Sequence, residues 1–395
     1  MIFNRWSILA LLVLVRTGTG IQYQTVASLS PLLMSDYSLG IADIGLLIGL
    51  YHAPGTILAF PGGAIGARLG DKRLVLTGLV LMAAAEFMMP FGPTWPAEMG
   101  ARILAGTGGI LLNVMMLKMV ADWFAGKETA TAMGIIGNAA PAGIALALVT
   151  IPSIAEMGGR TLASAATLGY LALAFASMAL AYRAPAEVAA VARQQKLWPQ
   201  RRVALALATA GMVYGIYNVG LTTILAYGPL MLAERGWTFA AASSVTSLVL
   251  WIVTVSLPGG GYLADRTGQR ALVLVGGLLA FAAAMALAPR VDDALPVFIL
   301  LGIASGLPCG VIMSLPTQVL SPATRAAGMG ILLTVYYVMN VCGPWAVGRI
   351  AELSGSPRFA FDVSALSLCG AIAFWLIFRR LANGTLIAAE AKAVS

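Results

Sequence analysis

The chain carries little charge for its length. Asp, Glu, Lys and Arg make up only 10% of its 395 residues, whereas 59% are hydrophobic, and the mean hydropathy is +0.89. A soluble domain carries roughly 25% charged residues, so this composition excludes an ordinary soluble protein. The alternating segments of about 10 residues that a membrane β-barrel requires are also missing. The sequence therefore indicates a helical protein that crosses the membrane many times.

Residues typical of active sites are scarce too. The chain has one histidine and three cysteines, and Cys309, Cys342 and Cys369 lie in apolar runs without metal-ligand spacing. A single histidine leaves little room for a Ser-His-Asp set, and no Gly-Lys-Ser/Thr phosphate loop is present. We therefore expect no enzyme, no metal, no other cofactor and no ATP-driven pump. The cysteines are expected to be packing residues without a disulfide.

Apolar runs recur along the whole chain, and each is long enough to span the membrane, which takes about 20 residues in a helix. We predict an all-α membrane protein with twelve transmembrane helices in two six-helix, pseudo-symmetric halves. The spans are expected at 7–34, 42–66, 73–91, 98–121, 129–154, 161–182, 203–232, 239–263, 271–288, 296–319, 328–350 and 361–378.

The positive charges favour one side of the membrane. Most of the 24 Lys and Arg fall in loops on the side that holds both termini. This bias predicts that both termini are cytoplasmic, and we expect a multi-pass protein of a bacterial inner membrane. The net charge of +8 is thus a topology signal. We expect the lipid bilayer and a small-molecule substrate as partners, no nucleic acid, and a monomer.

Several segments are repeated half a chain apart. FPGGAIGARLGDKR at 60–73 is similar to LPGGGYLADRTGQR at 257–270, and ETATAMGI at 128–135 is similar to TRAAGMGI at 324–331. Repeated membrane units are typical of secondary transporters, whose site lies between the repeats. The expected division is an N-terminal half at 1–182, a central cytoplasmic loop at 183–202, a C-terminal half at 203–378 and a cytoplasmic tail at 379–395.

The second copy of the longer repeat resembles a motif of the major facilitator superfamily. That motif is Gly, three residues, Asp-Arg, any residue, Gly, any residue and a basic residue, and Gly261, Asp265, Arg266, Gly268 and Arg270 occupy its positions. Together with the twelve spans, the resemblance covers the whole chain. It implies transport by alternating access along a path between the two halves.

The first copy departs from this pattern. It keeps Gly63 and Arg68, but Ala67 stands at the acidic position, and Asp71 is the nearest carboxylate. Glycines let helices approach closely, and an Arg can bind a carboxylate or helix-end carbonyls. We interpret both copies as a latch that holds the cytoplasmic side closed. The alternative is that their charges only set the topology.

Arg16 is the strongest candidate for substrate binding. It lies ten residues after Trp6, hence about 15 Å into the membrane core. Tyr23 and Gln24 share its helix face at helical spacing, and no acidic residue lies on this expected helix at that level. A buried cation without a protein anion favours an anionic substrate. The alternative is a structural Arg bonded to carbonyls or to a distant acid.

Other polar side chains are expected to line the same path. They lie on the fourth, seventh and eleventh expected spans, and the competing explanation for the tyrosines is anchoring at the membrane interface. They are Asn113, Tyr214, Tyr217, Asn218, Tyr336, Tyr337 and Asn340.

Three further residues are candidates for proton coupling. His52 has a suitable titration range, although a lone histidine is more often a packed core residue. Glu86 is the only carboxylate well inside an expected span. Arg102 is interpreted as a gate, a proton-path residue or a side chain that extends to the membrane surface.

These features predict a secondary transporter of a small organic or inorganic anion bound near Arg16, with proton coupling or exchange. The alternative is a proton-coupled exporter of drugs or metabolites. Against export of cationic drugs, the helices expected to line the path offer no carboxylate. A transporter-like membrane sensor is a third hypothesis. The short loops and termini give no sign of the signalling domain that a sensor would need.

Overall fold

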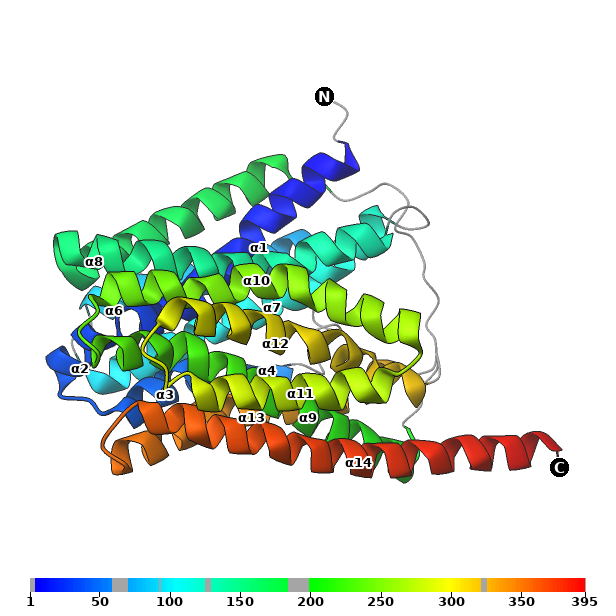
Figure 1. Cartoon of the computed structure of the whole chain (residues 1–395). Coiled ribbons are helices and arrows are strands. Elements are labelled where there is room, and N and C mark those ends of the chain that lie inside the picture. Colours follow the sequence, from blue (N-terminus) through cyan, green and yellow to red (C-terminus); the bar gives the residue numbers. More distant parts are fainter. Residues whose placement is uncertain are drawn as a thin grey trace.

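The computed structural model describes residues 4–58, 70–91, 94–124, 129–183, 199–320 and 325–394, and these form helices without a strand (Figure 1). In chain order the elements are α1 (Arg5–Ser28), α2 (Ser30–Tyr37), α3 (Ile41–Leu50), α4 (Ala53–Leu58), α6 (Asp71–Phe91), α7 (Trp95–Trp123), α8 (Thr129–Ala181), α9 (Arg201–Ala233), α10 (Phe239–Thr267), α11 (Arg270–Leu287), α12 (Ala294–Ser314), the 3₁₀ turn η1 (Leu315–Gln318), α13 (Arg325–Leu353) and α14 (Arg358–Val394).

These helices correspond to the twelve expected spans. The first span is α1 with α2, and the second is α3 with α4, interrupted at Tyr51 and His52 shortly before Pro54. The fifth and sixth spans are the two parts of α8, which non-helical backbone angles at Gly158 and Gly159 separate. Within the described ranges, nine helical stretches are long and apolar enough to cross a membrane, one of them holding both parts of α8. The all-α membrane architecture is confirmed.

Two expected boundaries differ from the structure. Helix α9 begins at Arg201, slightly before the expected 203, and residues 184–198 of the central loop lie outside the described residues. The expected tail is helical as far as Val394, because α14 continues beyond the last expected span. The sequence LIAAEAKA after the last span is rich in strong helix formers, which explains why the helix extends beyond the apolar run.

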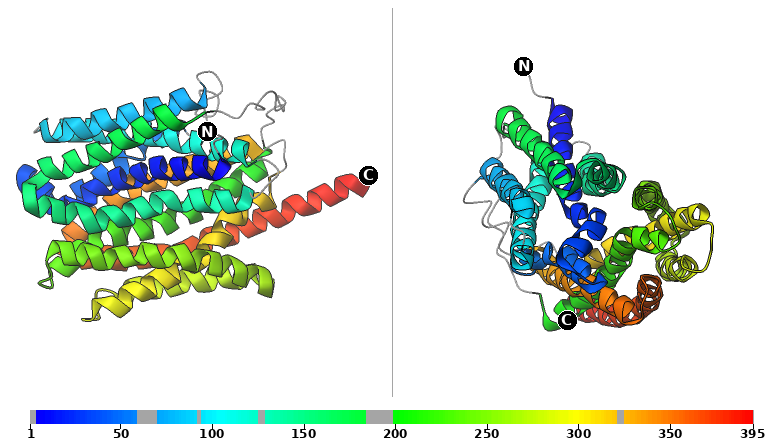
Figure 2. Two further views of the ribbon diagram at one scale, coloured as in Figure 1. Left: turned by 90° about the horizontal axis from the view of Figure 1, so that it is seen from above. Right: turned by 90° about the vertical axis from the view of Figure 1, so that its left-hand side faces the viewer.

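The helices form two halves, α1 to α8 and α9 to α14, which lie on either side of the bundle in the end-on view of Figure 2. Helix α3 packs on α13, and the first part of α8 packs on α10. We call the end that holds Arg201 and Arg270 the terminal end. The opposite end holds Tyr37 and Leu353. Small and branched residues, including Ala145, pack together where α8 meets the C-terminal half.

The two copies of the repeated segment share one backbone feature at a glycine that the structure describes in both. Gly70 has φ +83° and Gly268 has φ +68°, at equivalent positions of the two copies. Residues with a Cβ rarely adopt this left-handed region. Gly268 lies between the end of α10 and the start of α11, and Gly70 directly precedes α6. The shared turn supports the duplicated architecture that the sequence repeats predicted.

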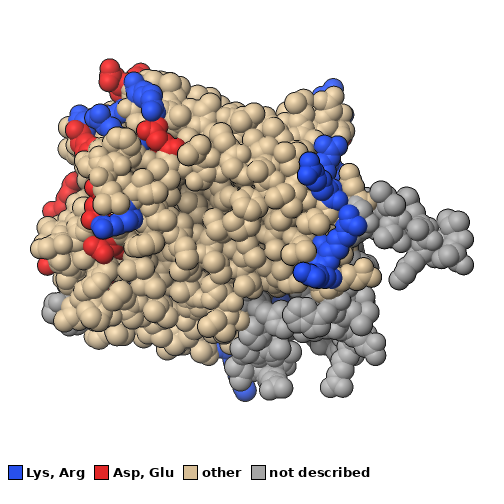
Figure 3. All heavy atoms as spheres, turned by 90° about the horizontal axis from the view of Figure 1, so that it is seen from below, with Lys and Arg blue, Asp and Glu red and all other residues tan. Residues whose placement is uncertain are grey.

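The surface is apolar around the middle and charged at the ends. In the face shown in Figure 3, Asp and Glu lie at one end only, whereas Lys and Arg occur at both. Large apolar side chains such as Val255 and Leu366, each 76% exposed, lie on the outer face of the bundle. Such an exposed belt is unfavourable in water and matches the hydrocarbon core of a membrane.

Candidate functional site

Arg16 lies halfway along α1, inside the bundle and between its two halves. Its Nε and Nη1 atoms are buried and have no hydrogen-bond partner among the described residues. The side chains of Tyr214 on α9 and Tyr337 on α13 are close enough to interact with its charge. Arg16 therefore faces the C-terminal half without an anionic partner in the part of the chain that the structure describes.

Aromatic rings from both halves meet next to this cation. Tyr214 stacks on Tyr336 with ring centroids 4.5 Å apart and planes inclined by 20°. Tyr336 lies 5.1 Å from Tyr337, and His52 lies 5.9 Å from Tyr337 and 5.1 Å from Tyr23. We call these five residues the aromatic cluster. All five are half-buried, so neighbouring helices do not fully seal them.

The local helix geometry explains how the cluster is held. Asn218 donates from Nδ2 to the carbonyl of Tyr214 at 2.9 Å, and Asn340 does the same to the carbonyl of Tyr336 at 2.8 Å. Both bonds link residues i and i+4 on one helix. The two amides thus bond to the backbone beneath the tyrosines of the cluster.

The other predicted lining residues have different surroundings. Gln24 donates to the carbonyl of Leu225 at 3.1 Å, which ties α1 to α9 across the halves. Tyr217 is buried in the C-terminal half with its ring 6.0 Å from that of Phe281. Asn113 on α7 is half-buried, and its Oδ1 has no partner among the described residues. The cluster beside Arg16 therefore does not include Gln24 or Tyr217.

Arg102 is fully buried in the N-terminal half. Its guanidinium donates to the carbonyls of Leu47, Gln22 and Tyr23 at 3.2, 3.0 and 3.0 Å. It also lies over the ring of Tyr51, 5.0 Å from the centroid. Arg102 thus fastens α7 to α1 and to α3 just before the interruption at Tyr51. Because it is 0% exposed, it does not extend to the membrane surface.

Glu86 on α6 is also fully buried and lies next to α1. Its Oε2 accepts from Gln22 Nε2 at 3.2 Å, whereas its Oε1 has no partner among the described residues. No ion pair forms at Glu86 within these residues. Glu86 therefore links α6 to α1 through Gln22 and keeps one carboxyl oxygen without a partner among the described residues.

The two loop motifs differ in their contacts. In the second copy, Arg270 and Asp265 form an exposed ion pair of 2.9 Å within the C-terminal half. Arg266 bonds to the hydroxyl of Tyr262 at 3.3 Å, and Gly261 and Gly268 flank these groups. This motif makes no ion pair with the residues of the N-terminal half that the structure describes.

In the first copy, Gly63 and Arg68 lie outside the described residues. Asp71 pairs with Lys118 of α7 at 2.6 Å. Lys72 donates to the carbonyls of Ala179 and Tyr182 at the end of α8, at 2.8 and 2.9 Å. The sequence analysis did not predict a role for Lys118. Its position in the expected fourth span was the one available sign that this charged residue has a specific partner.

Toward the opposite end, α3 of one half and α13 of the other approach each other closely. A Cβ atom at Gly45 or Gly49 would lie closer than 3.0 Å to the backbone oxygens of Pro344 or Val341. Nearby, Glu352 accepts a hydrogen bond from the backbone N–H of Ala42 at 3.3 Å. The halves are therefore held together beyond the aromatic cluster, on the side away from the terminal end.

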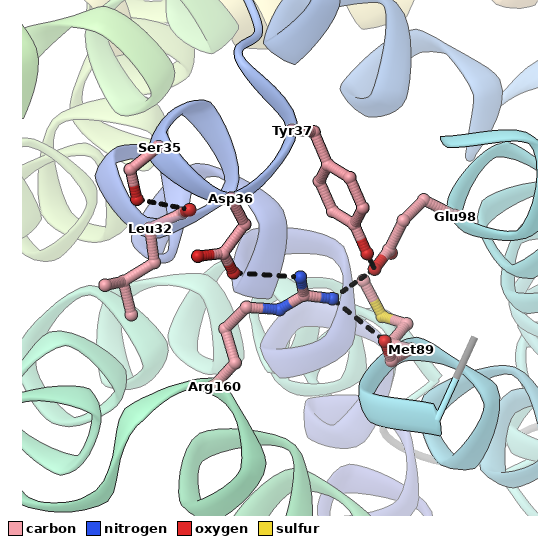
Figure 4. Close-up of polar contacts among 7 residues, drawn as sticks. All are labelled: Leu32, Ser35, Asp36, Tyr37, Met89, Glu98 and Arg160. Atoms are coloured by element: carbon pink, nitrogen blue, oxygen red, sulfur yellow. Dashed lines mark hydrogen bonds and ion pairs between the residues drawn. The ribbon is translucent and has the colours of Figure 1, made fainter. Parts of the chain in front are cut away.

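A second polar group at the opposite end lies within the N-terminal half (Figure 4). Arg160 of α8 donates to Glu98 of α7 and, at 3.2 Å, to Asp36 of α2; it also bonds to the carbonyl of Met89 at 2.9 Å. Tyr37 donates to Glu98 at 3.0 Å. This group fastens α2, α6, α7 and α8 together, and sequence spacing alone gave no signal for it.

Two helical halves meet around Arg16 and the aromatic cluster in the middle of the bundle, and this arrangement is typical of a secondary transporter. The sequence matches the Major Facilitator Superfamily over residues 12–228 and 203–393, and the chain belongs to that family. Its members are carriers, so the expectation that this chain is not an enzyme is confirmed.

Several known proteins are similar to this chain. An uncharacterised MFS-type transporter of Mycobacterium tuberculosis is 24% identical over 381 residues, which cover 93% of this chain and 82% of that protein. A protein of Agrobacterium vitis, provisionally named a tartrate transporter, is 30% identical over 45% of this chain and 40% of its own length. The lysosomal dipeptide transporter of Danio rerio is 24% identical over 65% and 60%.

Solved structures agree on the fold. The crystal structure of a bacterial homologue of the human lysosomal transporter Spinster, inward-facing and unoccupied, covers 97% of both chains with a TM-score of 0.72 and 15% identity.

Proposed function

We propose that this chain carries a small anion across the membrane by alternating access, with Arg16 as the cation that binds it. The supporting observation is the half-buried guanidinium whose Nε and Nη1 have no partner among the described residues. A charge removed from water without a counter-charge is costly. A guanidinium also presents a fork of N–H donors that fits carboxylate or phosphate oxygens. An anionic substrate supplies the missing partner.

The residues next to Arg16 suit such a ligand. Tyr214 and Tyr337 lie nearest to its charge, and we propose that they donate hydrogen bonds to the anion together with Tyr23 and Tyr336. Asn218 and Asn340 support two of these tyrosines through the backbone. The Oδ1 of Asn113 has no partner among the described residues, and in this proposal its amide completes the polar lining by donating from Nδ2. Tyr217 and Gln24 serve packing and closure in this proposal.

Glu86 is the favoured coupling residue. It is a buried carboxylate bonded to Gln22 on the helix that carries Arg16, and Arg102 bonds to the backbone of that same helix. Loss of the Glu86 proton would place a negative charge near Arg102 and disturb the position of α1. His52, inside the aromatic cluster, is the second candidate. The anion then moves with protons, or in exchange for another anion.

Alternating access follows from where the halves touch. Hydrogen bonds between the halves, among the described residues, run from Tyr23–Thr222 and Gln24–Leu225 to Ala42–Glu352, toward the opposite end. We propose that both termini are cytoplasmic in a bacterial inner membrane, which makes this the inward-facing state of a monomer. The Asp265–Arg270 motif then latches the cytoplasmic side when the halves rock.

The proposal is tested by thermal unfolding of the purified protein with a panel of small anions. A ligand bound only to the folded state raises the free energy of unfolding, by about 2.7 kcal/mol at 100 times its Kd. An anion should stabilise the parent and, more weakly, Arg16→Lys, but not Arg16→Gln. Arg290→Gln, which removes an exposed arginine that pairs with Asp362 within the C-terminal half, should respond like the parent. Equal stabilisation of Arg16→Gln would refute the proposal.

The competing function is export of drugs or metabolites. One observation favours it: the quinolone resistance protein of Staphylococcus aureus is 27% identical over 92 residues, which cover 23% of this chain and 24% of that protein. If neutral or cationic drugs stabilise the parent and no anion does, export becomes the better account.

A further inference from the structure

The aromatic cluster gives the site a chemical character beyond its charge. Its five rings come from α1, α9, α13 and the interruption between α3 and α4, and neighbouring centroids lie 4.5 to 6.4 Å apart. Such separations are typical of stacked and edge-to-face ring pairs. All five rings are half-buried, so each keeps accessible surface in the middle of the bundle. A small inorganic anion would use the cation and leave these rings without a partner.

The positive charge next to the cluster limits how many negative charges the ligand can carry. Two guanidinium groups interact with its tyrosines, those of Arg16 and Arg102. Arg102 is fully buried and bonded to three backbone carbonyls. Arg16 is therefore the cation that remains available among the described residues around the cluster. A ligand with one carboxylate matches this single available positive charge better than a ligand with two carboxylates.

Hydrogen bonding at the cluster points the same way. The hydroxyls of Tyr336 and Tyr337 make no hydrogen bond to the described residues, whereas Tyr23 is 3.4 Å from the hydroxyl of Thr222. Such hydroxyls can donate hydrogen bonds to a carboxylate or to a ring substituent of a ligand. The faces of the tyrosine rings can stack against a flat apolar group.

We infer that the anion carried at Arg16 is an aromatic monocarboxylate, whose carboxylate pairs with Arg16 and whose ring lies against Tyr214, Tyr336 and Tyr337. This inference rests on the proposed anion transport. The carboxylate supplies the charge that Arg16 lacks, and the flat ring covers aromatic surface that an aliphatic chain would contact less well.

The experiment is a calorimetric titration of the full chain in detergent with matched probes. Benzoate and phenylacetate are the aromatic acids, cyclohexanecarboxylate is the saturated control, benzamide is the neutral control, and tartrate is the aliphatic dianion. The variants are Tyr336→Leu, Tyr214→Leu, Tyr336→Phe and Arg16→Gln. Phe175→Leu removes an outer-surface ring that is 38% exposed and serves as the matched control. Melting curves without ligand confirm that each variant is folded.

We expect an aromatic acid to bind about tenfold more tightly than cyclohexanecarboxylate, and benzamide not to bind. Tyr336→Leu or Tyr214→Leu should weaken the aromatic acid about two- to tenfold more than cyclohexanecarboxylate, because both acids lose a hydroxyl donor but only the aromatic acid loses a ring contact. Tyr336→Phe, which keeps the ring, and Phe175→Leu should retain the preference.

Other outcomes separate this inference from the proposal beneath it. If cyclohexanecarboxylate or tartrate binds at least as tightly as the aromatic acids, and binding is lost in Arg16→Gln, anion transport stands and the aromatic inference is overturned. An aromatic preference that survives both Leu variants also overturns it. If no carboxylate binds, the aromatic inference is overturned, whereas anion transport fails only if the inorganic anions of the thermal panel also leave the parent unstabilised.

Discussion

The approach of α3 to α13 predicts what a single methyl group will do. Gly49 has no room for a Cβ atom, because that atom would overlap the carbonyl oxygen of Val341. Overpacking of this kind costs about 1–3 kcal/mol. The overlap exists only while the halves touch at the opposite end, so Gly49→Ala destabilises that state alone. The equilibrium between the two states should shift by about 5- to 150-fold.

The shift can be measured as a distance between two spin labels. After the three cysteines are replaced, labels at Ser35 and Ser354, both exposed at the opposite end, report the separation of the halves there. Gly49→Ala should add a longer component to the distance distribution. Gly100→Ala is the control, because a Cβ there would meet nothing within 4 Å. If Gly49→Ala gives the parent's distribution, this contact does not close the opposite end.

Three further changes test the fixed parts of the fold. Arg102→Gln should lower the melting temperature strongly, since it leaves buried carbonyls unsatisfied at about 1–3 kcal/mol each. Arg16→Gln should leave the melting temperature of the ligand-free protein unchanged or raised. A larger loss in Arg16→Gln than in Arg102→Gln would contradict the roles assigned to the two arginines. Glu98→Ala breaks an ion pair whose carboxylate is 0% exposed and should cost about 3–5 kcal/mol in unfolding measurements; a loss below 1 kcal/mol would count against it. Gly268→Ala should cost about 1–2 kcal/mol because of its positive φ, with Gly276→Ala, which meets no neighbour within 4 Å, close to neutral; equal losses would argue against strain.

The fold could be predicted from the sequence because its signals are local or repeated. Apolar runs predicted the spans, and the repeated loop segments predicted two halves that share the turns at Gly70 and Gly268. Counting residues from Trp6 placed Arg16 deep in the membrane. The sequence also placed Tyr214 and Tyr337 on the path with Arg16, but it could not show that these two lie nearest to its charge, since the faces presented by α9 and α13 depend on how the halves pack.

Spacing on one helix was an insufficient guide to the site. Tyr217 follows Tyr214 by three residues, which rotates it by roughly 60° around the helix, and this is enough to turn it toward Phe281 and away from the cluster. Arg102 lies near the start of α7 in sequence, yet the interruption after α3 brings the Leu47 carbonyl within its reach. The Arg160 group joins residues far apart in sequence, for which no pattern exists.

The most direct test of the account is flux through liposomes that contain the purified protein. An anion that stabilises the parent should enter parent liposomes down an imposed anion or proton gradient. The control Arg290→Gln should transport it at the parent's rate, and Arg16→Gln should stay near the protein-free background. Transport of that anion by Arg16→Gln at the parent's rate would contradict the claim that Arg16 binds the substrate.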